Sequence, residues 1–253
     1  MTTFSQQDIL IECVPNFSEG RNKATIDAIA KAIAEVKDVK LLHIDIGYDA
    51  NRTVFTFVGK PEAVVDAAFK AIHVAFHLID MQQHHGAHPR MGACDVCPLI
   101  PLQNISMEDT KSYSYILAEK VGSLGVPVYM YEASAKVADR SNLAYIRSGE
   151  YEAIEDKKQL AIWQPDFGSF LHSKHFGMIA IGARKFLLAY NVNLQTTDIE
   201  IGKKIAAIFR ADRKTNEKLQ YSKAIAWYME AYNCVQIYTN ITDCEQSSIF
   251  YVF

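Results

Sequence analysis

The sequence predicts an α/β protein, and three observations support this fold class. Segments with helical periodicity alternate with short β-branched and aromatic runs along most of the chain, which is the pattern of α/β folds. Hydrophobic residues make up 49% of the sequence and charged residues 22%, values that are ordinary for a globular protein. The 253 residues are enough for one large or two small domains, each burying its own core.

Charge and cysteine content argue against several classes of function. The formal net charge of −3 gives no electrostatic basis for binding nucleic acid or a membrane surface. No uncharged apolar run approaches the ~18 residues of a membrane helix, and the first residues lack the basic and apolar regions of a signal peptide. Five cysteines, an odd number, indicate reduced thiols. We therefore expect a cytoplasmic protein without a nucleic-acid or membrane partner.

The first elements are expected to be a strand, a helix and a hairpin. Leu10–Val14 is an apolar strand run that Pro15 stops. Isoleucine and valine recur at three- and four-residue spacing over residues 26–36, which predicts an amphipathic helix. Polar and apolar residues alternate over Leu42–Ile46, so this strand has one polar face. Arg52–Val58 is a second β-rich run and is expected to pair with it as a hairpin.

The middle of the chain is expected to hold two helices and two strands. A helix begins at Pro61, which is a favourable residue at the first helical position. Its buried stripe is expected to consist of Val65, Phe69, Ile72, Phe76 and Ile79. A loop over His84–Gly92 and an apolar strand over Val96–Leu102 follow. The next helix is expected around residues 113–121, and a further strand over Val126–Tyr131.

A domain boundary is expected after an irregular stretch at residues 163–177, where proline and glycine interrupt aromatic and basic residues. We predict an N-terminal domain over residues 1–180 and a C-terminal domain over residues 181–253. The second domain is expected to open with one long strand over Ala183–Leu194, because apolar and polar residues alternate along its length.

The C-terminal domain is expected to continue with a helix and two strands. Asp198 can cap the helix, and the strands are expected at residues 224–229 and 234–241. The apolar stripe of this helix is expected to consist of Ile201, Ile205 and Ile208. Thr242 and Glu245 have the spacing of a capping box for a last helix, which would end on exposed aromatic side chains. We therefore expect the second domain to be cut short.

Three histidines gather in the loop His84–Gly92, at positions 84, 85 and 88. Loops on a rigid scaffold often present reactive side chains. Pro89 restricts the backbone around His88, and histidine is the side chain best suited to exchange protons near neutral pH. A polar surface turn would contain the same residue types, so the catalytic and the structural interpretation both stay open.

Asp45, Asn51 and Arg52 form a second polar cluster around the predicted hairpin. Asp45 lies on the polar face of its strand and could orient an imidazole or hold a cation. The guanidinium of Arg52 offers a planar fork that suits a carboxylate. The alternative is an ordinary hairpin with a solvent-exposed arginine.

A zinc site is a further alternative, because His84, His88, Cys94 and Cys97 offer the ligand types that zinc prefers. The two cysteines lie inside an apolar strand, where residues three apart point to opposite faces. A closed site would therefore require this strand to bend, and we expect no metal.

The segment DFGSFLHSKHFG mixes aromatic rings with basic side chains between two glycines. Such a mixture suits a flat anionic ligand. An inter-domain linker is the alternative. No run has the glycine spacing of a dinucleotide- or phosphate-binding loop.

Seven longer runs stand out along the chain. They are CVPNFSEG (13–20), NRTVFTFVG (51–59), HHGAHPRMGACDVCPLIP (84–101), PVYMY (127–131), IRSGEYEAI (146–154), PDFG (165–168) and GARKFLLAYNVNL (182–194). In this order, the runs resemble glutamate formimidoyltransferase, the family that also forms the N-terminal part of the bifunctional formimidoyltransferase–cyclodeaminase. The resemblance extends from Ile11 almost to the end. It implies two α/β subdomains whose β-sheets face each other around a folate tunnel, with helices outside.

The resemblance also implies a reaction, the transfer of the formimidoyl group from N-formimidoyl-L-glutamate to tetrahydrofolate in histidine degradation. Tetrahydrofolate is then the acceptor substrate, and a homodimer without metal is expected. The catalytic histidine of the family matches His88, and a family acidic residue matches Asp45. Substrate binding is expected at Asn51, Arg52, Arg90 and Asn191, with the two arginines pairing with carboxylates.

A folate-contacting loop of the family matches the DFG segment. The residues expected to contact folate are Gly168, Ser169, Phe170, Leu171, His172, Ser173, Lys174, His175, Phe176 and Gly177. The chain departs from the family pattern in three of them, since residues 172, 174 and 175 are basic. No cyclodeaminase segment follows, so only the transferase activity is implied. Two other functions stay open: a zinc-dependent hydrolase built on the site above, and a non-catalytic folate-binding module.

Overall fold

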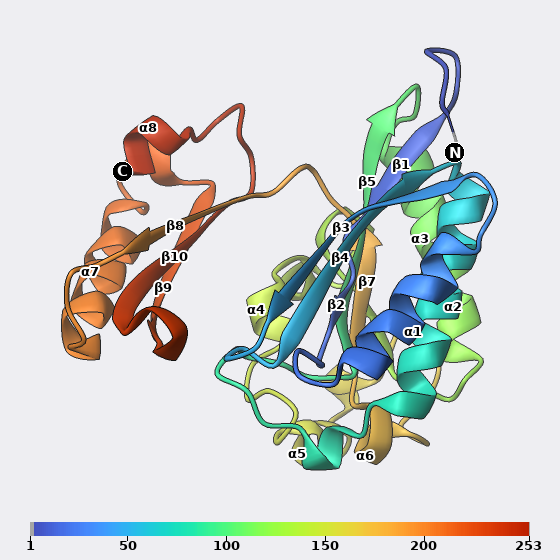
Figure 1. Cartoon of the computed structure of the whole chain (residues 1–253), viewed down its shortest axis with the longest axis horizontal. Helices are drawn as coiled ribbons and strands as arrows, with labels where there is room; N and C mark the ends of the chain where they lie inside the picture. The colour runs from blue at the N-terminus through green and yellow to red at the C-terminus, as the bar shows by residue number, and fades with distance from the viewer. Residues whose placement is uncertain (1–2, 253) are drawn as a thin grey trace. The chain divides into compact units, whose positions relative to one another are not determined.

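The computed structural model describes residues 3–252. Contacts divide the chain into two units, Met1–Arg184 and Lys185–Phe253, and each unit has its own β-sheet with helices against it (Figure 1). The predicted α/β class is therefore confirmed. Within the described residues, no helix is both long and apolar enough to span a membrane.

The sheet of the first unit is built around one interrupted strand. β1 (Leu10–Cys13) and β2 (Asn16–Phe17) both lie between β4 (Arg52–Gly59) and β5 (Cys94–Gln103), antiparallel to each of them. Pro15 lies at the interruption, as the sequence predicts, because its ring nitrogen has no proton to donate to a neighbouring strand.

Three further strands complete this sheet. β3 (Val39–Gly47) pairs antiparallel with β4 and forms the predicted hairpin. On the other side, β7 (Ile179–Ala183) is parallel to β5, and β6 (Val128–Met130) is parallel to β7. The sheet is therefore mixed, with antiparallel strands at the β3 end and parallel strands at the β6 end.

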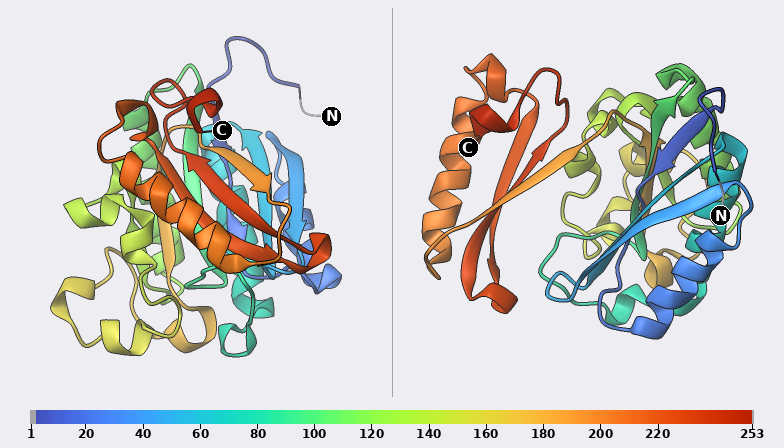
Figure 2. Two further views of the ribbon diagram at one scale, coloured as in Figure 1. Left: turned by 90° about the vertical axis from the view of Figure 1, so that its left-hand side faces the viewer. Right: turned by 45° about the horizontal axis from the view of Figure 1, so that its top comes forward.

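Three long helices pack together with the main core of the first unit. They are α1 (Lys23–Ala34), α2 (Pro61–Leu78) and α3 (Met107–Gly122), and Figure 2 shows α1 and α2 side by side against the sheet. The side chains of Asn22 and Ser106 accept backbone N–H groups at the starts of α1 and α3, which satisfies donors that helix ends leave free. The buried face of α2 is rich in alanine, whereas Phe69 and Phe76 are only partly buried.

A second core lies around short helices after β6. α4 (Leu143–Ile146) and α5 (Ile154–Lys157) contribute to a cluster that contains Tyr129, Tyr131 and Trp163. The helix α6 (Ser173–Phe176) lies in the stretch expected to be irregular. Short 3-10 turns occur at Met81–Gln83, Glu132–Ser134, Ala138–Ser141, Ala161–Trp163, Glu217–Leu219 and Glu230–Tyr232.

The prediction of one long strand over Ala183–Leu194 is wrong. β7 ends at Ala183 in the first unit, and β8 (Leu188–Asn193) belongs to the second. β7 is buried at all five positions, so it shows no alternation that a sequence pattern could detect. The alternation that suggested a long strand belongs to β8 alone.

The second unit is a three-stranded antiparallel sheet in the order β8–β10–β9, with β9 at Ser222–Met229 and β10 at Cys234–Ile241. The helix α7 (Ile199–Asp212) packs on β9 and β10 (Figures 1 and 2). Asp198 caps it as predicted, accepting from the Glu200 N–H at 2.9 Å.

The predicted apolar stripe of α7 is wrong. Ile201, Ile205 and Ile208 are 43%, 39% and 62% exposed. The buried face contains Gly202 and Ala206 instead. A Cβ atom at position 202 would lie 2.5 Å from Val235 Cγ1, so the helix approaches the sheet through small residues and its isoleucines lie away from this contact.

The capping box predicted at Thr242 is also wrong. The Thr242 hydroxyl donates to the carbonyl oxygen of Tyr221 at 3.0 Å, and the last helix, α8, covers only Ile249–Val252. Phe253, one of the aromatic residues expected at the end of this helix, lies outside the described residues.

Candidate active site

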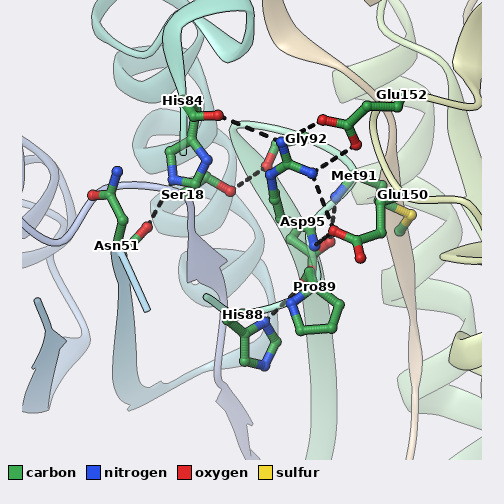
Figure 3. A network of polar contacts seen from close by, with 11 residues as sticks. Ser18, Asn51, His84, His88, Pro89, Met91, Gly92, Asp95, Glu150 and Glu152 are labelled. Carbon is green, nitrogen blue, oxygen red and sulfur yellow. Dashed lines mark hydrogen bonds and ion pairs between the residues drawn. The ribbon is translucent and has the colours of Figure 1, made fainter. Parts of the chain in front are cut away.

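The loop His84–Gly92 is anchored to the β3–β4 turn by Asn51 (Figure 3). The Asn51 side chain donates from Nδ2 to the His85 carbonyl at 2.9 Å and accepts the Gly20 N–H at 2.9 Å. Its backbone carbonyl accepts from Nε2 of His84 at 2.8 Å. Asn51 was predicted to bind substrate, and in this structure its amide holds the loop in place.

Arg90 also anchors the loop. Its guanidinium pairs with Glu150 at 3.0 Å and with Glu152 at 2.6 Å. The Arg90 carbonyl accepts the Tyr151 N–H at 3.0 Å. The arginine that was predicted to bind a substrate carboxylate is thus already paired with two protein carboxylates.

The loop continues into a junction with the predicted folate segment. The Ala93 N–H donates to the Phe176 carbonyl at 2.7 Å, and the Met178 N–H donates to the Met91 carbonyl at 2.8 Å. Gly92 and Gly177 face each other at this junction. In addition, the Tyr151 hydroxyl donates to the Lys174 carbonyl at 2.5 Å, so the two predicted site segments are joined directly.

The His88 imidazole is 5% exposed. Nδ1 lies 2.6 Å from the Pro89 carbonyl oxygen, and Nε2 lies 2.5 Å from Nη1 of Arg52. Because a carbonyl only accepts and a guanidinium only donates, the proton is assigned to Nδ1 and the lone pair to Nε2. Burial, followed by the positive charges of Arg52 and Arg147, holds the pKa of His88 well below its ordinary value of 6.5. The imidazole is therefore neutral at neutral pH.

Asp45 and Asn191 are the two remaining residues that were predicted to belong to the site. Asp45 is exposed on β3, opposite Val54, and no hydrogen bond or ion pair joins it to His88 in the part of the chain that the structure describes. The Pro89 carbonyl takes the orienting position at Nδ1 that was expected for Asp45. Asn191 is exposed on β8 in the second unit. Catalytic or binding roles for both residues stay predictions.

Comparison with known proteins identifies the family. A family model described as the formiminotransferase domain, N-terminal subdomain, matches residues 10–184, and one described as the formiminotransferase domain matches residues 189–253. The chain belongs to the formiminotransferase family. The resemblance noted in the sequence is thereby confirmed.

Relatives of this chain differ in length. It is 45% identical to formimidoyltransferase-cyclodeaminase from Sus scrofa over 251 residues, which are 96% of this chain and 46% of the relative. It is 44% identical to glutamate formimidoyltransferase from Thermoplasma acidophilum over 244 residues, 95% of this chain and 79% of the relative. The same enzyme from Streptococcus pyogenes is 39% identical over 245 residues, 96% and 81% of the two chains. The chain thus spans about half the length of the cyclodeaminase relative.

The predicted folate segment is buried at its C-terminal end and exposed at several other positions. Ser173, Phe176 and Gly177 are buried and fix its C-terminal end. Nε2 of His175 donates to the Phe76 carbonyl oxygen at 2.8 Å. The exposed residues of the segment, which remain accessible to a ligand, are Gly168, Ser169, Leu171 and Lys174.

The geometry around the two cysteines does not support the zinc alternative. Cys94 and Cys97 were predicted to point to opposite faces, and this is wrong, because an irregularity of β5 beside β2 brings both into the main core. Cys97 Sγ lies 3.5 Å from Sγ of Cys13 there. Across residues 3–252, no three His, Cys, Asp or Glu side chains form a group that could hold a metal ion.

Sequence reasoning missed Asp95 and Arg147. Asp95 is 1% exposed and accepts the Met91 N–H at 2.9 Å, and its other oxygen pairs with Nη2 of Arg147. The detectable signal was an aspartate inside the otherwise apolar run of β5, because a buried carboxylate needs a cation or hydrogen-bond donors. The identity of the cation could not be read from the sequence, since Arg147 lies far along the chain.

Proposed function

We propose that this chain transfers a formimidoyl group from N-formimidoyl-L-glutamate to tetrahydrofolate, with His88 as the acid–base residue. The observation that carries the proposal is a buried, neutral imidazole whose Nδ1 is fixed by the Pro89 carbonyl. The printed names of the archaeal and bacterial relatives, glutamate formimidoyltransferase, support the same reaction. Production of 5-formimidoyltetrahydrofolate and L-glutamate from the two substrates tests it.

The chemistry requires one proton carrier. A pteridine nitrogen attacks the amidine carbon and forms a new C–N bond, and Nε2 of His88 takes the proton that this nitrogen loses. The resulting imidazolium donates the proton to the glutamate nitrogen, whose bond to the same carbon then breaks. The Nδ1 contact with Pro89 holds the other ring proton on Nδ1 throughout, so Nε2 is the atom that takes and returns the transferred proton. Asp45 would act electrostatically, because a carboxylate stabilises the positively charged amidinium.

The proposal extends to the setting of the reaction. We infer from the family that the chain works in the cytoplasm, in histidine degradation, and as a homodimer. Light scattering on the purified chain measures the oligomeric state directly.

A first prediction concerns metal ions. Incubation with chelators is expected to leave both folate binding and turnover unchanged, because proton transfer by His88 requires no metal. Metal analysis of the purified chain and turnover before and after chelation check this. Stoichiometric zinc whose removal abolishes turnover would favour the hydrolase alternative instead.

A second prediction concerns the exposed Lys174 side chain. Its charge is placed to attract the glutamate carboxylates of a folate tail. Lys174→Ala is expected to weaken binding of polyglutamylated tetrahydrofolate about two- to fivefold, the worth of one exposed ion pair, and to change monoglutamate binding less. The difference shrinks as added salt screens the charge.

The matched control for Lys174 is Lys31→Ala. The Lys31 side chain is 74% exposed on α1, so this variant changes the net charge equally without changing the folate segment. Equal effects of the two substitutions on both ligands would remove Lys174 from the tail site.

A further inference from the structure

Buried polar atoms without a hydrogen-bond partner gather around the His84–Gly92 loop. Among the described residues they include Nδ1 of His84, Nε of Arg90 and Nε of Arg147. Buried donors and acceptors are nearly always paired in native proteins. Unpaired atoms of this kind, close to a proposed active site, mark positions where groups of a ligand belong.

Arg147 is held firmly beside the loop. Its Nη2 pairs with Asp95, which also binds the Met91 N–H at 2.9 Å, so the guanidinium is tied to the segment that follows His88. Its side chain is only 17% exposed, and Nε remains unpaired. A guanidinium has five N–H donors, so Arg147 can bind a second anion without leaving Asp95. Its positive charge also contributes to the lowered pKa of His88.

Arg52 lies on the same imidazole, with Nη1 at 2.5 Å from Nε2 of His88. Two guanidinium groups thus act on one neutral histidine. Arg90 differs from them, because Glu150 and Glu152 already surround its guanidinium with negative charge, which would repel another carboxylate. The surroundings of His88 therefore favour an anionic ligand at Arg52 and Arg147.

We propose that Arg147, together with Arg52, binds a carboxylate of the amino-acid donor beside His88. The proposal rests on the function proposed above and assigns Arg147 as a donor-specificity residue. A carboxylate attracts Nη1 of Arg52 away from Nε2 of His88, and this exposes the lone pair that takes the proton of the attacking nitrogen. Binding of the donor therefore also frees the base, Nε2 of His88, from its contact with Arg52.

Arg147→Lys tests this proposal. Lysine keeps the positive charge beside Asp95 but has no Nε and no planar fork. The KM for formimidoylglutamate is expected to rise about 10- to 100-fold, the worth of a hydrogen bond to a charged group, while the KM for tetrahydrofolate changes less than about twofold. Two donor analogues, with either the α- or the γ-carboxylate replaced by an amide, show which carboxylate Arg147 contacts. The analogue that lacks this carboxylate is expected to have the same KM with the wild type and with Arg147→Lys.

Arg140→Lys is the matched control. Arg140 forms a buried ion pair with Asp166 at 3.1 Å in the same unit, so its substitution disturbs a similar pair that does not contact His88. It is expected to lower thermal stability to a similar degree and leave both KM values unchanged. Equal rises of the two KM values in Arg147→Lys, or a loss of stability alone, would overturn the assignment.

Calorimetric binding of L-glutamate, the product, separates this assignment from the proposed function. If the wild type binds L-glutamate but shows no turnover, and Arg147→Lys does not bind L-glutamate, the proposed function is disproved and the carboxylate site is retained. A wild-type chain that turns over and whose donor KM is the same in Arg147→Lys would retain the function and disprove the site. A wild type that neither turns over nor binds L-glutamate would disprove both.

Discussion

Replacement of His88 by alanine is expected to reduce turnover about 10²–10⁴-fold, the usual worth of one positioned acid–base group. The substitution removes a small volume from a loop that Asn51, Arg90 and the Gly92–Gly177 junction hold independently. The fold and folate binding are therefore expected to persist. Steady-state turnover, a folate-binding titration and thermal unfolding measure the three quantities separately.

His85→Ala is the control for this experiment. The His85 side chain is exposed in the same loop, and the loop contact made by residue 85 uses its backbone carbonyl, so its turnover should stay close to that of the wild type. Wild-type turnover in His88→Ala would show that the central assignment is wrong.

The pH dependence follows from the same residue. Because the folded-state pKa of His88 lies well below 6.5, the free enzyme keeps its base until the pH falls below that value, and the acid limb of kcat/KM lies below pH 6.5. The favourable contribution of neutral His88 to the free energy of unfolding is present above pH 6.5 and is lost as the pH falls toward the folded-state pKa. His88→Ala removes both dependences, which titration of activity and of stability can detect.

Gly177→Ala is expected to lower the free energy of unfolding by about 2–5 kcal/mol, from a strained φ and from the overpacking of a close contact. Gly177 has φ +83°, and a Cβ atom there would lie 2.2 Å from the Met91 carbonyl oxygen. The backbone must shift to remove this overlap, and the His88 loop shifts with it. Turnover should therefore fall even at temperatures where the variant is folded. Chemical denaturation and steady-state turnover check the two effects.

Gly125→Ala separates backbone strain from the clash. Gly125 also has a positive φ, +75°, but an added Cβ atom meets only side-chain atoms of His172 and Leu171, at 3.1–3.3 Å. The free energy of unfolding is expected to fall by about 1–2 kcal/mol, because only the cost of the left-handed backbone conformation applies. Equal losses in the two variants would mean that the junction between the loops is not tight.

Local patterns predicted most of the first unit, because its strands and helices follow the two- and 3.6-residue periods. β7 was missed since a strand buried on both faces has no alternation. The buried face of α7 was misjudged because Gly202 and Ala206, rather than its isoleucines, allow close packing. In both cases the conformation or the buried face depends on a partner that is distant in the sequence, so the local sequence pattern does not contain the information.

The candidate site also contains residues that local patterns predicted and residues that they missed. The residue types and turn signals of the loop predicted His88 and Arg52, and the structure places them in contact. The glutamates that occupy Arg90, and the buried pair of Asp95 with Arg147, join segments that are far apart in the sequence. Such pairings depend on the three-dimensional fold, so a single sequence could not reveal them.

The anchoring of the His88 loop also constrains how the chain folds. Its hydrogen-bond partners come from Ser18 after β2, from the β3–β4 turn, from the segment after α4 and from the segment before β7, so the loop cannot reach its final conformation until these four regions have come together. Closing such long loops is entropically costly and is completed only when many contacts form at once. A nascent or partly folded chain therefore has no preformed imidazole site, and the proposed proton-transfer site forms in the same cooperative step as the tertiary structure of the first unit.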